Sequence, residues 1–141
     1  MADNPITATV RETKKSPMSV EVIVDGFRIE ADEPVDSGGK NLAPYPHEIL
    51  VAALGACTAQ TVRWYASRHD IPLDAVEVDL TYEREHVGGR GGQIDVFTKL
   101  VHLTGAKLTP AQRAKLIEVA GKCPIQRVME GSPVIKTSER T

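Results

Sequence analysis

The sequence predicts an α+β protein in which antiparallel strands are combined with two main helices. Three observations lead to this fold class: a hairpin pattern near the amino end, a long apolar segment in the middle, and two further alternating segments followed by a capped helix. Neighbouring strands joined by short turns form antiparallel sheets, whereas parallel strands need long crossover connections. The 141 residues have room for one ordinary domain, so we expect a single domain over residues 1–141.

The clearest local prediction is a β-hairpin in the stretch SVEVIVDGFRIEAD, residues 19–32. Apolar and polar residues alternate on each side of Asp25-Gly26, and this period of two is typical of strands with one buried face. The Asp-Gly pair supplies the positive φ angles that a tight hairpin turn requires. A shorter strand is expected before the hairpin, at about residues 8–11, where it is ended by the Pro-containing break at 14–17.

A long loop over residues 33–47, with three prolines and two glycines, leads into a predicted helix from about 46 to 69. Pro46 suits the first helical position, where its missing N–H is no loss. The stretch ILVAALGACTAQTV is apolar on nearly every side, and such a helix is normally buried all round. Since so small a chain can hardly cover it, we expect a homodimer, with Gly55 and the alanines allowing close approach of two helices.

The second half of the chain is expected to begin with two long strands. Alternation predicts one strand over residues 76–83 and another over 93–105, separated by the glycine-rich turn at 88–92. Neither this turn nor the stretch SGGK joins a strand to a helix with the spacing that cradles phosphate. Both are therefore interpreted as loops.

Two helices and a strand are predicted to follow. Thr109, Pro110 and Gln112 form a helix start, with a threonine cap, an early proline and a glutamine three residues after the cap. This helix should end at Gly121 or Cys123, because Pro124 cannot continue it without strain. A short helix then begins near Pro124 and ends at residues 131–133, and the stretch VIKTS, residues 134–138, is expected to be a last strand.

Composition and charge exclude several classes of function. The formal net charge is −2 and the isoelectric point is about 6.1, so no basic excess favours nucleic acid or an anionic membrane. We find no signal-peptide pattern and no apolar run long enough to span a bilayer, so a cytoplasmic protein without nucleic-acid or membrane partners is expected. The four histidines are scattered without metal-ligand spacing, and no metal or other cofactor is implied.

The chain has only two cysteines, Cys57 and Cys123. Cys57 could be a small apolar residue of a buried helix, and Cys123 could be a helix cap without chemistry. A thiol at a helix start, however, meets unpaired N–H groups that lower its pKa. If the fold brings the two together, one thiol could attack a peroxide O–O bond and become a sulfenic acid, and the other could condense with it to a disulfide.

Two stretches, PHEILVAALGACTAQTV and KCPIQRVM, resemble the two motifs of the OsmC/Ohr superfamily of organic hydroperoxide reductases. The predicted order of strands and helices is also similar over almost the whole chain. The resemblance implies an OsmC-like fold, an intertwined homodimer with two central helices back to back, and an active site at the interface. It further implies that Cys57 is the thiol that attacks the peroxide and Cys123 the thiol that resolves the sulfenic acid.

The sequence departs from the best-studied peroxidases of that family around the start of the central helix. Their Asn-Pro-Glu pattern places the glutamate ten residues before the first cysteine, whereas here His47 follows Pro46 and Glu48 lies nine residues before Cys57. At about 100° per residue, Glu48 lies roughly opposite Cys57 and about 13 Å along the axis, while His47 lies about 80° away. Glu48 could instead act as a first-turn acid that stabilises the helix.

The family's peroxidases also bring an arginine onto the thiolate, where a guanidinium stabilises it and binds the peroxide. Arg11 is the nearest positional match in this sequence, and Arg28 is a weaker one. The alternative is a surface arginine beside Glu12 or Glu30.

The function expected from these features is a thiol-dependent peroxidase that reduces organic hydroperoxides, with an antioxidant role in the oxidative stress response. A dithiol reductant would complete the cycle, and the apolar helix residues Leu50, Leu54 and Val62 would favour organic over hydrogen peroxide. We expect Cys57 to be the more buried of the two thiols. The alternative is a non-enzymatic, stress-related protein that binds a small apolar ligand at the dimer interface, with thiols kept for structure.

Overall fold

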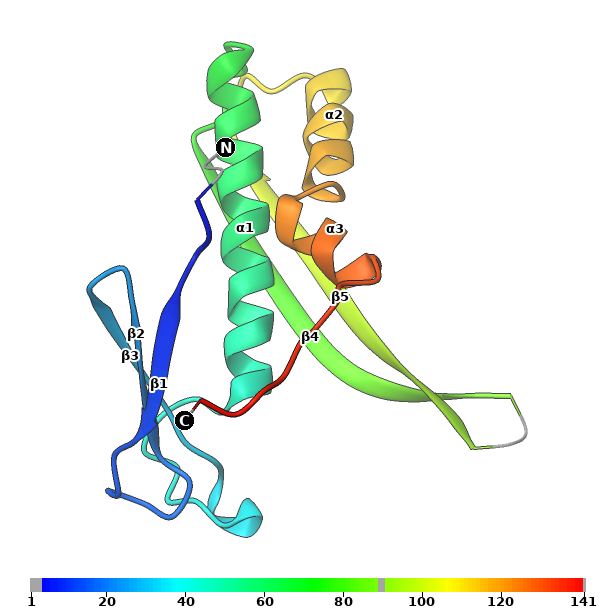
Figure 1. The fold of residues 1–141 in the computed structure, drawn as a ribbon. Helices are drawn as coiled ribbons and strands as arrows, with labels where there is room; N and C mark the ends of the chain where they lie inside the picture. The colour runs from blue at the N-terminus through cyan, green and yellow to red at the C-terminus, as the bar shows by residue number, and fades with distance from the viewer. Residues whose placement is uncertain (1–3, 89–90, 141) are drawn as a thin grey trace. The chain divides into compact units, whose positions relative to one another are not determined.

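The computed structural model describes residues 4–88 and 91–140 (Figure 1). These residues divide into two compact units, one ending at Leu50 and the other beginning at Val51. Each unit contains an antiparallel sheet, of three strands in the first and two in the second, and three α-helices complete the architecture. The predicted α+β class with antiparallel strands is therefore confirmed.

The first unit contains the predicted hairpin. Strands β1 (Ala8–Glu12), β2 (Val20–Val24) and β3 (Phe27–Ala31) form a sheet in that order. At the turn between β2 and β3, Asp25 has a φ of 51° and Gly26 a φ of 78°, the positive angles that the Asp-Gly pair predicted.

The loop after β3 folds around a buried carboxylate. Asp32 is only 1% exposed and accepts hydrogen bonds from the Ser16 hydroxyl (2.7 Å) and from the backbone N–H groups of Glu33 (2.8 Å), Lys40 (3.2 Å) and Leu42 (3.1 Å). Burial by itself raises the pKa of Asp32, but these four donors outweigh it and lower the pKa to about 2. The hydrogen bonds to the ionised Asp32 thus hold the loop in place. The loop also contains the short 3₁₀ helix η1 (Val35–Ser37).

The second unit contains a long hairpin, two short helices and the part of a long helix that follows Leu50. Helix α1 (Pro46–Arg68) is followed by strands β4 (Ala75–Val87) and β5 (Gly92–Thr104), which pair from Ala75 opposite Thr104 to Val87 opposite Gly92. Positions 89 and 90 of the predicted glycine-rich turn lie outside the described residues. Helices α2 (Pro110–Ala120) and α3 (Pro124–Glu130) lie beside α1 (Figure 1). The core of this unit is formed by side chains from these elements and their connections: Val62, Ala66, Leu73, Leu103, Leu108, Leu116 and Ala120.

The predicted helix boundaries in this unit are confirmed. The Thr109 side chain accepts from the Gln112 N–H, and the Gln112 side chain accepts from the Thr109 N–H, which completes the capping box at the start of α2. Helix α2 ends at Ala120, and α3 begins at Pro124 with Cys123 as its N-cap residue.

The last strand predicted over residues 134–138 is wrong. This segment has no regular secondary structure, and Val134 and Ile135 are 81% and 85% exposed. A strand needs a neighbour that takes its backbone hydrogen bonds, and in the described part of the chain neither sheet includes this segment.

The expectation for Gly55 also needs correction. Gly55 is buried, and a Cβ atom at this position would lie 2.6 Å from the Leu80 Cδ1 atom on β4. Its missing side chain therefore allows α1 to approach a strand of the same chain rather than a partner helix. Ala52, Ala53 and Ala56 are the exposed alanines of this helix.

Candidate functional site

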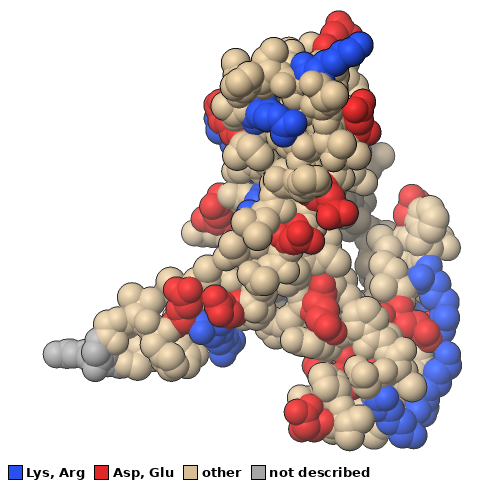
Figure 2. Space-filling view, turned by 180° about the vertical axis from the view of Figure 1, so that it is seen from behind, with Lys and Arg blue, Asp and Glu red and all other residues tan. Residues whose placement is uncertain are grey.

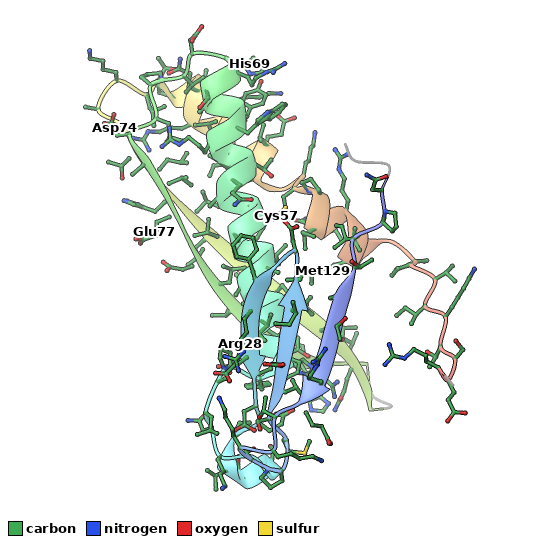
Figure 3. All side chains as sticks on the ribbon, turned by 60° about the vertical axis from the view of Figure 1, so that its left-hand side comes forward. Arg28, Cys57, His69, Asp74, Glu77 and Met129 are labelled. Carbon is green, nitrogen blue, oxygen red and sulfur yellow. The ribbon has the colours of Figure 1, made fainter. Side chains whose placement is uncertain are left out.

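The structure brings the two cysteines together, although 65 residues separate them in the sequence. Cys57 lies on α1, and its Sγ atom accepts a hydrogen bond from the Ile125 N–H in the first turn of α3 (3.5 Å). In Figure 3 the labelled Cys57 lies on α1, beside α3. Both residues are free thiols, and the Cys57 thiol is a hydrogen-bond partner of Cys123. The two sulfur atoms are therefore neighbours in one site.

Cys123 is fully buried and surrounded by hydrogen-bond donors. Its Sγ atom accepts from the Gln126 N–H (3.4 Å) and lies 3.6 Å from the Thr58 Oγ1 atom. Burial raises the pKa of the Cys123 thiol, but hydrogen bonds from Thr58, Gln126 and Cys57, together with the charge of Lys99, outweigh burial. The resulting pKa lies below the ordinary value of 9.0, so Cys123 forms a thiolate more readily than an ordinary cysteine does.

The expectation that Cys57 is the more buried thiol is wrong. Cys57 is half-buried, whereas Cys123 has no exposed surface. The reason is that Cys123 lies at the junction of α2 and α3, against the buried Thr58 of α1. Of the two thiols, Cys57 is the one that a molecule from solvent can reach.

Three polar residues of this site were missed at the level of the sequence: Thr58, Lys99 and Gln126. The Lys99 ammonium on β5 donates to Thr58 Oγ1 (3.0 Å), to the Ala120 carbonyl oxygen (2.6 Å) and to Gln126 Oε1 (2.7 Å). A local signal for Lys99 does exist, because it shares a strand face with the half-buried Phe97 and Val101. A lysine at an inward-facing strand position is unusual unless it has buried partners.

A pocket of about 800 Å³ adjoins this network. Its lining combines the apolar residues Leu54, Ile94, Val96, Phe97 and Met129 with the polar residues Asp95, Lys99, Gln126 and Glu130. Lys99 and Gln126 belong both to the lining and to the hydrogen bonds around Cys123. The predicted apolar residue Leu54 does line this pocket, whereas Val62 is wholly buried in the core.

The model of the OsmC-like protein family matches residues 38–138 of the chain. The chain belongs to the OsmC-like protein family. The resemblance seen in the two cysteine motifs is thereby confirmed.

Several solved structures share the fold of this OsmC-like protein. An organic hydroperoxide resistance protein, OsmC, from Legionella pneumophila is 19% identical, with a TM-score of 0.69 and coverage of 93% of each chain. The organic hydroperoxide resistance protein OhrB of Bacillus subtilis is 18% identical, with a TM-score of 0.63 over 92% of this chain and 93% of its own. An OsmC-like protein from Mycoplasma pneumoniae is 21% identical, with a TM-score of 0.68 over 92% and 90%. A comparison with curated proteins finds no match.

The other predicted site residues of this OsmC-like protein lie in the first unit. Arg11 on β1 is exposed, and its Nε atom lies 3.9 Å from Glu21. Arg28 on β3 lies 2.9 Å from both Glu21 and Glu30. Figure 2 shows Lys and Arg side chains gathered on one side of this unit. The role of Arg11 at the thiols stays a prediction.

Glu48 and His47 lie in the first turn of α1. The Glu48 Oε1 atom accepts from the Tyr45 N–H (3.0 Å), directly before the helix, so Glu48 stabilises the start of α1 as a first-turn acid can. The His47 ring lies 5.9 Å from the Tyr45 ring. The catalytic roles of Glu48 and His47 stay predictions.

Within residues 4–88 and 91–140, no group of three or more His, Cys, Asp or Glu side chains is placed to hold a metal ion. A search of the same residues finds no helix with the length and apolar character needed to cross a membrane.

Proposed function

We propose that this OsmC-like protein is a thiol-dependent peroxidase that reduces organic hydroperoxides to alcohols. The observation that carries the proposal is the pair formed by the accessible Cys57 and the buried Cys123, whose pKa is lowered by donors around it. Proteins of the same fold from Legionella and Bacillus are named organic hydroperoxide resistance proteins, which supports the same class of substrate.

In the proposed resting state Cys123 is a thiolate and the Cys57 thiol donates a hydrogen bond to it. Transfer of this proton leaves Cys57 as the thiolate, the form that acts as a nucleophile. The Cys57 sulfur attacks the terminal oxygen of the hydroperoxide R–O–O–H, and the O–O bond breaks. The terminal oxygen stays on Cys57 as a sulfenic acid, and the alkoxide takes the proton from Cys123 and leaves as the alcohol.

The second half of the cycle regenerates the thiols. The Cys123 thiolate attacks the sulfenic sulfur of Cys57, the S–S bond forms, and the hydroxide that leaves is protonated to water. The peroxide has then gained two electrons, which the two thiols supplied. A dithiol reductant opens the disulfide by thiol–disulfide exchange and becomes a disulfide itself.

The pocket beside the site supports organic rather than hydrogen peroxide as substrate. Its apolar lining can remove the alkyl group of a hydroperoxide from water, and this burial contributes roughly 25 cal/mol per Å² of apolar surface. Hydrogen peroxide has no such group. We therefore expect kcat/KM to be higher for alkyl or aryl hydroperoxides than for hydrogen peroxide.

The decisive experiment identifies the attacking sulfur. After one equivalent of cumene hydroperoxide, mass spectrometry of the Cys123→Ser variant should find a sulfenic acid on Cys57. Oxidation of Cys123 in the matched Cys57→Ser variant, with no oxidation of Cys57 in Cys123→Ser, would reverse the two roles. If the wild-type protein consumes hydroperoxide no faster than free dithiothreitol does, the peroxidase proposal fails, and the binding of a small apolar ligand becomes the better account.

The predicted activating groups of Cys57 are part of the proposal. Arg11 is the candidate cation, Glu48 the residue that orients it, and His47 an alternative partner. Loss of a cation beside a thiolate slows attack about tenfold for each 1.4 kcal/mol. Arg11→Ala should thus lower the rate of hydroperoxide consumption with fold and assembly unchanged, and an equal rate would exclude Arg11 from this role.

We further propose that the protein acts as a homodimer, with both units forming one functional domain. Exposed apolar side chains support assembly, including Trp64 on α1 (58% exposed) and Ile135 near the carboxyl end (85% exposed). A stable monomer at micromolar concentration in sedimentation velocity experiments would contradict the dimer. Two free thiols that cycle through a disulfide fit a reducing compartment, and we propose the cytoplasm.

A further inference from the structure

The three hydrogen bonds of the Lys99 ammonium show that this side chain is held in place. An ammonium has three N–H donors, and the structure provides three acceptors: Thr58 Oγ1, the Ala120 carbonyl oxygen and Gln126 Oε1. All three acceptors are neutral, so these bonds fix the position of the charge without compensating it. The charge acts on Cys123, where it favours the thiolate.

Thr58 connects Lys99 to the Cys123 sulfur. Its side chain is fully buried, and its hydroxyl lies 2.8 Å from the Leu54 carbonyl oxygen and 3.6 Å from Cys123 Sγ. A hydroxyl has one hydrogen to donate, so it cannot fully serve both acceptors at once. Lys99 donates to the Thr58 hydroxyl oxygen and leaves the hydroxyl hydrogen unused. This hydrogen can therefore turn toward either the Leu54 carbonyl oxygen or the Cys123 sulfur, whichever is more negative. A thiolate at Cys123 is the stronger acceptor, whereas a neutral thiol or a disulfide leaves the hydrogen with Leu54.

Gln126 provides a second connection from Lys99 to the same sulfur. Its side-chain oxygen accepts from Lys99 (2.7 Å), and its backbone N–H donates to Cys123 Sγ (3.4 Å). Its side-chain Nε2 atom donates to Glu130 (3.2 Å), one helical turn further along α3. By holding the Gln126 side chain, Lys99 therefore also orients the first turn of α3, whose backbone N–H donates to Cys123.

We propose that Lys99 is a positioning residue that keeps the thiol pair singly deprotonated, with the negative charge on Cys123, by acting through Thr58 and Gln126. Cys123 then serves as the base that removes the proton of Cys57, in addition to resolving the sulfenic acid. This consequence for catalysis rests on the proposed function, whereas the ionisation itself can be measured without any peroxide.

The charged groups around the pair are consistent with this role. Asp95 and Glu130 line the same pocket as Lys99. Asp95 accepts from the Tyr82 hydroxyl (2.6 Å) and lies 3.3 Å from Arg84. Glu130 accepts a hydrogen bond from the Gln126 side-chain amide. Among the residues lining the pocket, the positive charge is that of Lys99.

The test uses the fact that the chain has only two cysteines. In a Cys57→Ala background Cys123 is the single thiol, and its thiolate absorbance at 240 nm can be followed against pH. Lys99→Met should raise the pKa of Cys123 by about one unit or more, a roughly tenfold lower ratio of thiolate to thiol at a given pH below it. Lys99→Arg should restore most of the shift, because it keeps the charge. Lys122→Met is the matched control, since Lys122 is exposed and pairs with Glu118, and it should leave the titration unchanged.

A folded Lys99→Met protein that titrates like its parent would overturn the proposal. If Lys99→Met does not fold, the comparison of Thr58→Val with Thr58→Ser decides, because valine keeps the volume and only serine keeps the hydroxyl. Thr58→Val should raise the pKa of Cys123 and Thr58→Ser should not, and identical titrations of the two would overturn the proposal.

Hydroperoxide consumption by the cysteine-intact proteins separates this inference from the proposed function. A wild-type protein without peroxidase activity whose Cys123 titration still depends on Lys99 would overturn the function and support the positioning role. If the wild-type protein is active but the Cys123 titration does not change on Lys99→Met, the result would support the function and overturn the positioning role.

Discussion

Each of the two units contains one buried acidic group surrounded by hydrogen-bond donors, and the two groups differ in what their donors achieve. In the first unit Asp32 accepts from three backbone N–H groups and the Ser16 hydroxyl. In the second unit Cys123 meets one backbone N–H, the Thr58 hydroxyl and the Cys57 thiol, with the charge of Lys99 nearby. The arrangements are alike, but the groups at their centres ionise in different ranges of pH.

This difference decides the role of each group. A carboxyl with an ordinary pKa of 3.8 is ionised at neutral pH with or without help, so the donors around Asp32 only fix the shape of a loop. A thiol with an ordinary pKa of 9.0 is mostly protonated at neutral pH, so the donors around Cys123 raise the fraction of thiolate by lowering its pKa. Similar donors therefore fix the shape of a loop in one unit and lower the pKa of a thiol in the other.

The largest expected effect comes from filling the space beside Asp32. A Cβ atom at Gly39 would lie 2.0 Å from the Glu33 carbonyl oxygen and 2.7 Å from Asp32 Oδ1. Gly39→Ala should lower the free energy of unfolding by about 1–3 kcal/mol, the usual cost of overpacking, in urea denaturation. Gly121→Ala is the control, because its Cβ would meet its nearest atom at 3.5 Å, an ordinary contact. Equal stability of both variants would show that the loop does not need this close approach.

The charge of Asp32 should appear in the pH dependence of stability. Its pKa is about 2 in the folded protein and near 3.8 when unfolded, so its stabilisation is complete above about pH 4 and is lost as the pH falls toward 2. Asp32→Asn should be less stable than wild type at neutral pH and should lack this acid-dependent decline. Urea denaturation between about pH 2 and 6 measures the free energy of unfolding of both proteins. Asp36→Asn is the control, because Asp36 is exposed. Parallel curves for wild type and Asp32→Asn would contradict the role of the carboxylate.

In the second unit, Gly55 and Ala56 separate packing within the chain from assembly. Gly55→Ala forces the Leu80 side chain to move and should cost about 1 kcal/mol of folding stability, the low end of overpacking because a side-chain end can yield. Ala56 is exposed, so Ala56→Leu should leave the folding of the unit nearly unchanged and weaken the proposed homodimer. Urea denaturation and sedimentation velocity measure the two effects. The opposite pattern would return Gly55 to the dimer interface.

The smallest expected effect is the contribution of Cys123 ionisation to stability. Its pKa is lowered in the folded protein, so the stabilisation is present above the unfolded value of 9.0 and is lost as the pH falls through the folded pKa. The difference in free energy of unfolding between wild type and Cys123→Ser should therefore grow from about pH 7 to about pH 9. A difference that stays constant over this range would mean that folding does not favour the thiolate.

Much of the local structure was determined by short stretches of sequence. The Asp25-Gly26 turn, the capping box of Thr109 and Gln112, and the break at Pro124 each depend on residues a few positions apart. Such interactions leave a readable pattern because turn residues, caps and apolar periods act within one or two turns of chain. The two cysteines were recognisable as candidates for the same reason, since each lies in a short motif.

The tertiary structure alone decided which groups surround those cysteines. The hydrogen bond from Lys99 to Thr58 spans 41 positions, and the contact from Thr58 to Cys123 spans 65. It also decided that Cys123 is the buried thiol and that residues 134–138 are not a strand of either sheet. The pKa of a thiol depends on the donors and charges within a few ångströms of it, and here distant segments supply them. No local pattern around Cys123 contains Lys99 or Thr58, so only the folded chain shows that they lie beside this thiol.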